Sequence, residues 1–242
     1  MIGLDSEDIA AILLSLKVAS VATVAALPLA FAAAYILARK RFVGRGLLDA
    51  VIFLPLVFPP VATGYGLLVL LGRQGWLGHA LASFGVVFAF RWAGAAIAGA
   101  VMAFPLMVRP MRLAIEAIDN EALEAARTLG ASSLSRLFRV TLPLAAPGVV
   151  AGAVLGFAKA LGEFGATITF VAAIPGETLP LPSAIYLATQ TPGGETRAAM
   201  LCAVAAFIAI VAVLASNWVA RRLSPSANDG ASRAIGTAGS RR

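Results

Sequence analysis

The sequence of 242 residues has few charged side chains, a single cysteine and a single histidine. Asp, Glu, Lys and Arg together make up 13% of the chain, whereas 60% of it is hydrophobic. Because charged residues make up about 25% of a typical soluble domain, this composition excludes an ordinary soluble protein. The lone Cys202 excludes an internal disulfide, and its apolar neighbours in the sequence indicate a packing role.

Motifs for catalysis, metal binding and nucleotide binding are also missing from the sequence. His79 stands among glycines, where a solvated loop residue is expected, and no group of residues has metal-ligand spacing. We find no phosphate-binding glycine loop and no nucleophile beside a base. We therefore predict that this chain has no catalytic residue, no metal and no cofactor of its own, and that it cannot hydrolyse ATP by itself.

Long hydrophobic runs dominate what is present. Five runs approach or exceed the roughly 20 residues that a helix needs to cross a bilayer. They cover residues 18–38, 47–71, 86–108, 144–174 and 198–220. The sequence thus predicts an all-α polytopic membrane protein with five transmembrane helices. The fourth run is longer than a hydrocarbon core of about 30 Å requires, so we expect it to tilt, bend or continue beyond the membrane.

The positions of the basic residues predict the orientation in the membrane. These residues follow the first, third and fifth runs: Arg39, Lys40, Arg41 and Arg45; Arg109, Arg112, Arg127, Arg136 and Arg139; and Arg221, Arg222, Arg233, Arg241 and Arg242. The positive-inside rule places such loops in the cytoplasm, with the N-terminus outside and the C-terminus inside. The net charge of +7 therefore indicates an orientation rather than a nucleic-acid partner. Acidic residues from Asp5 to Asp8 argue against a cleaved signal peptide, which begins with a basic segment.

A polar segment separates the third and fourth runs. Residues 120–129 should form a short helix capped by Asp119 or Asn120, and Gly130 suits the left-handed backbone that ends a helix. A second helix should start at Ser132 or Ser133, and Pro143 should mark the return to the membrane. The expected apolar stripe of the first helix consists of Ala122, Ala125, Ala126 and Leu129. By itself, this pattern also fits a simple amphipathic connector.

The spacing in this segment resembles the Glu-Ala-Ala signature of the membrane-spanning subunits of binding-protein-dependent ATP-driven importers. In that family the segment forms cytoplasmic coupling helices that dock on a separate ATPase subunit. The resemblance implies a coupling loop of residues 109–143, with a helix pair between spans three and four. It implies ATPase contact by Glu124, Ala125, Ala126, Leu129, Gly130, Val140, Leu142 and Pro143.

Two of the hydrophobic runs carry residues that are unusual inside a membrane. Pro59 and Pro60 should kink the second run, either for structure alone or as part of a gate. Lys159 and Glu163 lie one helical turn apart in the fourth run, and a charge at mid-membrane costs about 2.5–3.5 kcal/mol, so both should avoid lipid. They either serve a transported anion or form an internal ion pair. Thr167 and Thr169 could add hydroxyl groups to the same path.

Glycines in the fourth run predict close packing. Gly148, Gly152 and Gly156 recur every fourth residue and would let another backbone approach one face of the helix. Their spacing does not distinguish a contact within one subunit from a contact across a dimer.

The resemblance extends over most of the chain. Residues 13–18, 54–60, 102–109, 161–170, 174–178 and 190–195 are similar to molybdate importer permeases, while sulfate and tungstate permeases share part of this pattern. The implied fold is the importer permease (MetI-like) fold, with a periplasmic lead at residues 1–12, a transmembrane permease domain at 13–222 and a disordered cytoplasmic tail at 223–242.

The same resemblance implies partners, location and mechanism. A homodimer in the bacterial inner membrane would form the molybdate path, in contact with membrane lipid and without nucleic acid. Two copies of a cytoplasmic ATPase subunit would bind ATP and Mg²⁺, and a periplasmic molybdate-binding protein would deliver the anion for alternating access. An ion-driven secondary transporter is a rival hypothesis, but it predicts paired inverted repeats, which the sequence does not display. A membrane-embedded sensor or assembly protein is a second rival.

Overall fold

The computed structural model describes residues 4–223, and every regular element within that range is a helix. The predicted tail at 223–242 lies outside the described residues except for Leu223, the last residue of α11, and the first three residues of the predicted lead lie outside them too. The helices are α1 (Ser6–Arg39), α2 (Arg45–Val57), α3 (Pro60–Leu71), α4 (Trp76–Ala82), α5 (Trp92–Glu116), α6 (Asn120–Thr128), α7 (Ser133–Arg136), η1 (Leu137–Thr141, a π-helix), α8 (Leu142–Leu161), α9 (Gly165–Val171), α10 (Leu181–Gln190) and α11 (Glu195–Leu223).

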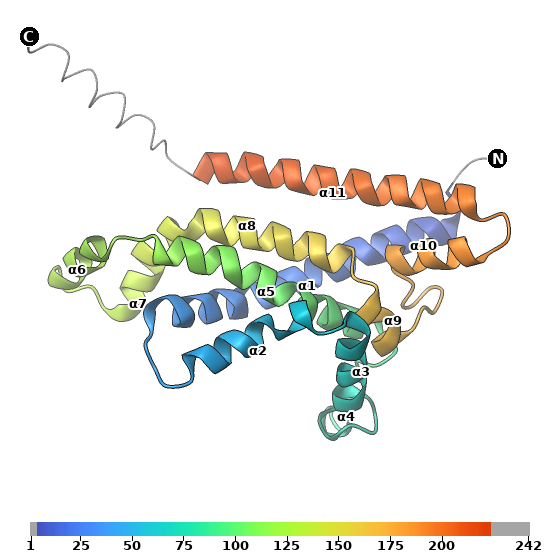
Figure 1. Cartoon of the computed structure of the whole chain (residues 1–242), viewed down its shortest axis with the longest axis horizontal. Coiled ribbons are helices and arrows are strands. Elements are labelled where there is room, and N and C mark those ends of the chain that lie inside the picture. The colour runs from blue at the N-terminus through green and yellow to red at the C-terminus, as the bar shows by residue number, and fades with distance from the viewer. Residues whose placement is uncertain (1–3, 224–242) are drawn as a thin grey trace, which may run out of the picture.

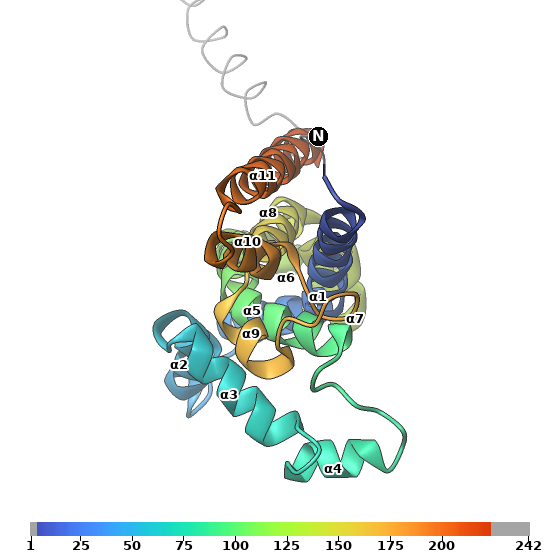
Figure 2. The same cartoon turned by 90° about the vertical axis from the view of Figure 1, so that its right-hand side faces the viewer.

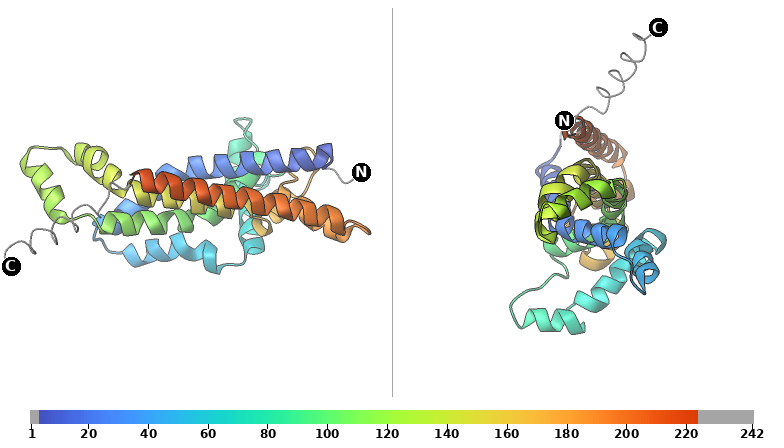
Figure 3. Two further views of the ribbon diagram at one scale, coloured as in Figure 1. Left: turned by 90° about the horizontal axis from the view of Figure 1, so that it is seen from above. Right: turned by 90° about the vertical axis from the view of Figure 1, so that its left-hand side faces the viewer.

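The long helices α1, α5, α8 and α11 run along the length of the molecule, as Figure 1 shows. Small residues bring the first three together: the α1 side chains Ala22, Ala26, Ala30 and Ala34 recur every fourth residue and are all buried. Close packing of small residues is the usual basis of helix association in a membrane, where water does not drive apolar surfaces together. Helix α11 lies along the outside of this group (Figure 3), and only 11% of its most apolar stretch is buried.

The glycine stripe of α8 packs within the subunit, against α5. A Cβ added at Gly148 would lie 2.4 Å from the Cβ of Ala114, and one added at Gly152 would lie 2.7 Å from the carbonyl oxygen of Met107. Both distances are too short for a side chain. The structure thus confirms close packing and identifies the partner helix, which the spacing could not do.

The second hydrophobic run is bent much more sharply than a kinked span. Helices α2 and α3 have 13 and 12 residues, and the chain bends by 114° between them. As a result, α3 and α4 project away from the long helices (Figure 2). Neither half reaches the roughly 20 residues of a membrane span. Among the described residues, four helices are long and apolar enough to cross a membrane, or five if the bent pair is counted as one.

Other element boundaries differ from those expected. Helix α1 begins at Ser6 because Asp5 and Asp8 form a capping box, so much of the predicted lead is helical. Helix α5 begins at Trp92 rather than near residue 86, because Phe90 adopts a positive φ of 58° just before it. The fourth run does bend: its helix ends at Leu161, and a new helix starts at Gly165.

Candidate functional site

The polar segment between the third and fourth runs folds as two short helices at one end of the molecule (Figure 1). Asp119 caps α6, and its carboxylate accepts a hydrogen bond of 3.0 Å from the amide of Glu121. Gly130 ends the helix with φ +80°, and the hydroxyl of Ser132 accepts a bond of 3.2 Å from the amide of Ser135 at the start of α7. The expected helix, turn and second helix are therefore confirmed as structure.

Several apolar side chains in and beside this helix pair are exposed. Leu123 and Ala126 are half-buried, whereas Glu124 and Ala125 are exposed. Three large apolar side chains that follow in the sequence are exposed to solvent: Leu129 is 88% exposed, Leu134 65% and Phe138 58%. We call these five exposed residues the coupling surface: Glu124, Ala125, Leu129, Leu134 and Phe138. An exposed apolar patch with a polar rim is typical of a protein-binding site.

The remaining residues of the signature do not start a separate element. Val140, Leu142 and Pro143 belong to a continuous helical segment from Ser133 to Leu161. Within it, η1 has the wider π-helical pattern, in which the amide of Leu142 bonds to the carbonyl of Leu137. Pro143 follows directly and has no amide hydrogen to donate, which favours such an irregular turn. Pro143 therefore marks a change of helical pitch between α7 and α8 rather than a new start.

The tertiary structure brings together two helix breaks that are about 100 residues apart in the sequence. A Cβ added at Gly165, the first residue of α9, would lie 2.8 Å from the Cβ of Pro60 in α3. A Cβ added at Gly64 would lie 2.4 Å from the carbonyl oxygen of Ala166. The Pro59-Pro60 break therefore lies against the break that precedes Gly165, and the close approach depends on glycine on both sides.

Lys159 and Glu163 form an ion pair at the second of these breaks. The Glu163 side chain is only 2% exposed, and its other oxygen accepts a bond of 3.0 Å from the amide of Ala166, at the start of α9. The Lys159 side chain keeps 29% exposure. Thr169 donates to the carbonyl of its own helix at Gly165, and Thr167 is buried. Four of the predicted path residues thus surround one helix break, while a role in the path stays a prediction.

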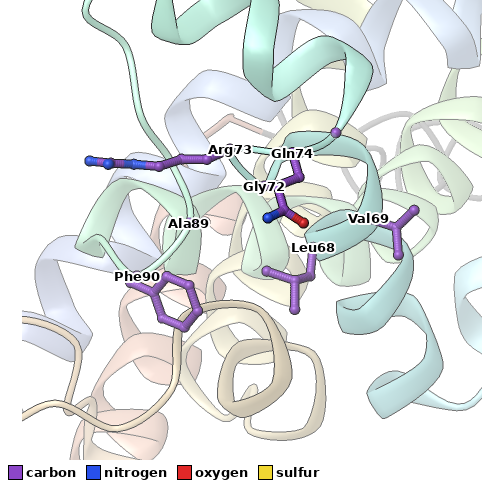
Figure 4. A pocket seen from close by; sticks show the side chains of 8 residues that line it. Leu68, Val69, Gly72, Arg73, Gln74, Ala89 and Phe90 are labelled. Atoms are coloured by element: carbon purple, nitrogen blue, oxygen red, sulfur yellow. The ribbon is translucent and has the colours of Figure 1, made fainter.

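A cavity of about 580 Å³ lies away from these path residues. Figure 4 shows its walls: Leu68 and Val69 from α3, Arg73 and Gln74 from the turn after it, and Phe90 from the segment before α5. The cavity contains none of the Lys159, Glu163, Thr167 and Thr169 side chains. We assign the path residues from the helix breaks and not from this cavity.

The contact between α3 and α9 makes a direct prediction. Gly64→Ala should lower the melting temperature of the detergent-solubilised protein by several degrees, because the added methyl group collides with the backbone of Ala166. Gly66→Ala is the matched control, since a Cβ at Gly66 meets nothing within 4 Å. Equal melting temperatures for the two variants would contradict the packing of α3 on α9.

Several polar residues that the sequence marked only by their charge have specific partners in the structure. Arg112 pairs with Asp49 of α2 at 2.6 Å and with Glu116 at 2.9 Å, and so ties α2 to α5. The buried Asp8 pairs with Arg197 at 2.7 Å and joins the starts of α1 and α11. Arg39 bonds to α5 and α6. Apart from Arg112 and Glu116, which are one helical turn apart, the partners are 63 to 189 residues apart, and no motif in the sequence indicates those pairs.

Comparison with known proteins gives a consistent result. The family described as binding-protein-dependent transport system inner membrane component matches residues 26–229. The chain is similar to the molybdenum transport system permease protein ModB of Escherichia coli strain K12, with 54% identity over 87% of this chain and 93% of the relative. It is 50% identical to the corresponding Haemophilus influenzae protein over 92% of this chain and 98% of that one.

The fold has a relative among solved structures. A bacterial ABC transporter involved in the import of the acidic polysaccharide alginate contains a chain that matches 91% of this one, with a TM-score of 0.73. That match covers 81% of the transporter chain at 20% sequence identity, so it concerns the fold alone.

Proposed function

Since this chain belongs to the family of binding-protein-dependent transport system inner membrane components, we propose that it is the permease subunit of an ATP-driven molybdate importer. The observation that carries the choice of anion is its identity of 50% or more with molybdenum permeases along nearly their whole length. The relatives are transport permeases, which supports a role in transport rather than catalysis. ATP and Mg²⁺ would bind to a separate ATPase subunit, and this chain would hold no cofactor.

The coupling surface is the proposed site of attachment to that ATPase. Its exposed Leu129, Leu134 and Phe138 offer apolar area for a groove on the partner, and Glu124 at its rim can pair with a basic group there. This surface lies at the end of the molecule where the basic loops after α1 and α5 also meet, as the bond between Arg39 and Asn120 indicates. We place this end in the cytoplasm of a bacterial cell, with the membrane crossed by five spans.

A homodimer is proposed because the break between α2 and α3 exposes backbone groups that need protein or water around them. Pro59 and Pro60 have no amide hydrogens, so the carbonyls of Pro55 and Leu56 lack their usual helical donors. Irregular backbone at membrane depth is tolerated only against protein or a water-filled cavity. Phe58, Pro59 and Pro60 are nevertheless exposed in the single chain. A second copy across this break, with the anion path between the two, would satisfy these groups.

The stripe on α3 supports the same interface. Val61, Tyr65 and Val69 recur every fourth residue and are each more than half exposed. Val57, at the end of α2 on the other side of the break, is 85% exposed. These exposed apolar side chains would pack on the second copy beside the break.

Alternating access would then follow from differential binding. Closure of two ATPase subunits on ATP would move the coupling surfaces and favour a path open to the outside, and release of hydrolysis products would favour the opposite state. A loaded periplasmic binding protein would have to bind the outward-open state more tightly to promote it. The breaks at Pro59-Pro60 and before Gly165 are the proposed points where the path opens and closes.

The choice of anion has a direct test. Proteoliposomes that contain this chain, its ATPase and its binding protein should take up radiolabelled molybdate when ATP is present on the side of the membrane where the ATPase is bound. A hundredfold excess of sulfate should not stop this uptake. Tungstate, which has the same charge as both anions but is closer to molybdate in size, should compete. Uptake that sulfate abolishes would reassign the importer to sulfate, and uptake that follows an ion gradient without ATP would favour a secondary transporter.

A further inference from the structure

One arginine at the end of α1 holds the end of α5 and the start of α6 at the same time. The Arg39 Nη2 group donates to the carbonyl oxygens of Ile115 and Ile118, both at 2.8 Å. Its Nη1 group donates to the side-chain oxygen of Asn120, the first residue of α6, at 2.7 Å. The three acceptors lie 76 to 81 residues further along the chain.

The chemistry of this contact requires an arginine. A guanidinium presents its donors in a rigid planar fork, so one side chain can serve three fixed acceptors, and a positive charge is favourable beside the C-terminal carbonyls of a helix. A lysine would bring the charge but not the fork. The carbonyl of Ile115 is in the last turn of α5, where a helix lacks internal donors, and that of Ile118 is in the connection to α6.

Helix α6 has few other attachments to the long helices. None of its residues is buried, and Leu123 is the α6 side chain that packs on the main hydrophobic core. Only Ala117, Ile118 and Asp119 connect α6 to the end of α5. A force on α6 can therefore reach the long helices through Arg39, or it can be absorbed by a bend in this short connection.

We propose that Arg39 is a positioning residue that transmits the movement of α6 to α1 and α5. This inference rests on the proposed function, in which an ATPase moves the coupling surface. Because α1 and α5 pack closely through small side chains, a displacement of α6 carried by Arg39 would move both helices together. Without the contact, ATP would still be hydrolysed, but less of the movement would reach the path.

The test measures anion imported per ATP hydrolysed, in proteoliposomes that hold this chain, its ATPase and its binding protein. Arg39→Gln should lower this ratio about tenfold, within the usual range of coupling between sites, while ATP hydrolysis falls less than twofold. Asn120→Ala removes only the bond to α6 and should lower the ratio in the same direction. Arg39→Lys should not restore it. Arg41→Gln is the matched control, because it removes an exposed charge two residues away.

A ratio for Arg39→Gln equal to that of the unchanged protein would overturn the proposal. An equal fall in the ratio for Arg41→Gln would also overturn it, since the effect would then come from the loss of positive charge after α1 and not from the contact of Arg39. Wild-type vesicles without ATP-driven uptake would instead contradict the proposed function.

A second measurement tests the contact without any partner. A nitroxide label at Ala125→Cys, in a chain whose exposed Cys202 is replaced by alanine, reports the mobility of α6 in the full-length protein. Arg39→Gln should sharpen the electron paramagnetic resonance spectrum of this label, because α6 loses its polar attachment. Arg41→Gln should leave the spectrum unchanged. A spectrum that is the same with and without Arg39 would overturn the proposed contact, whether or not the vesicles transport molybdate.

Discussion

Gly130→Val is expected to abolish co-purification of this chain with its ATPase while membrane insertion stays normal. Gly130 has a φ of +80°, and a Cβ there would meet nothing within 4 Å, so the substitution strains the backbone without a collision. A β-branched residue in this conformation costs about 1–3 kcal/mol. The turn would relax by rotating α7 relative to α6, which separates Leu129 from Leu134 and Phe138 in the coupling surface.

Two companion variants separate the turn from general strain. Gly193→Val imposes the same penalty, because Gly193 has a φ of +77° and equally open surroundings, but it lies outside the coupling loop and should leave ATPase binding intact. Gly130→Asn should retain most of the binding, since asparagine tolerates the left-handed region. Normal co-purification of Gly130→Val would count against the coupling surface as the ATPase contact.

Lys159→Met is expected to produce the second large effect, a loss of both thermal stability and uptake. It leaves the Glu163 carboxylate buried without its cation, and removal of one partner from a buried pair costs about 3–5 kcal/mol. The value should fall at the lower end because the Lys159 side chain is 29% exposed. The measurements are the melting temperature of the protein in detergent and molybdate uptake in vesicles.

The double variant Lys159→Met/Glu163→Gln distinguishes the two hypotheses about this pair. If the pair only fixes the helix break, removal of both charges should restore the melting temperature and bring uptake back to within a few-fold of the unchanged protein. We expect this outcome, because Glu163 is already engaged by Lys159 and by the amide of Ala166. Restored stability without restored uptake would contradict it and would make Lys159 a residue of the anion path.

The local features of the coupling helices could be predicted from the sequence because their causes are local. Asp119 caps the helix that follows it, Gly130 takes the left-handed turn, and Ser132 caps the next helix. The exposure along the expected stripe was less predictable: Ala126 was expected in the same stripe as Leu129, yet it is half-buried while Leu129 is 88% exposed. That difference depends on how α6 packs on the core through Leu123.

The membrane part was predictable in outline and not in detail. Proline indicated the weak point at Pro59-Pro60, since it disturbs a helix in any context. The length of the fourth run indicated that this run would tilt, bend or continue, but not that its helix would break before Gly165. The size of the bend between α2 and α3, 114°, was not predictable, and α3 in that position contacts a distant residue, with Gly64 against Ala166. The start of α5 at Trp92 likewise depends on the backbone turn at Phe90, which no residue type there requires.

The sequence by itself determined the membrane character, the sorting of basic loops and the coupling segment, because hydrophobicity, charge and capping act over a few neighbouring residues. Only the tertiary structure decided that the two helix breaks meet, that the α8 glycines pack on α5, and that Arg39 joins α1, α5 and α6. These contacts join residues far apart in the chain. They arise from the close approach of backbones at small residues and from the fixed geometry of a guanidinium, and in neither case does a pattern in the sequence identify the partner.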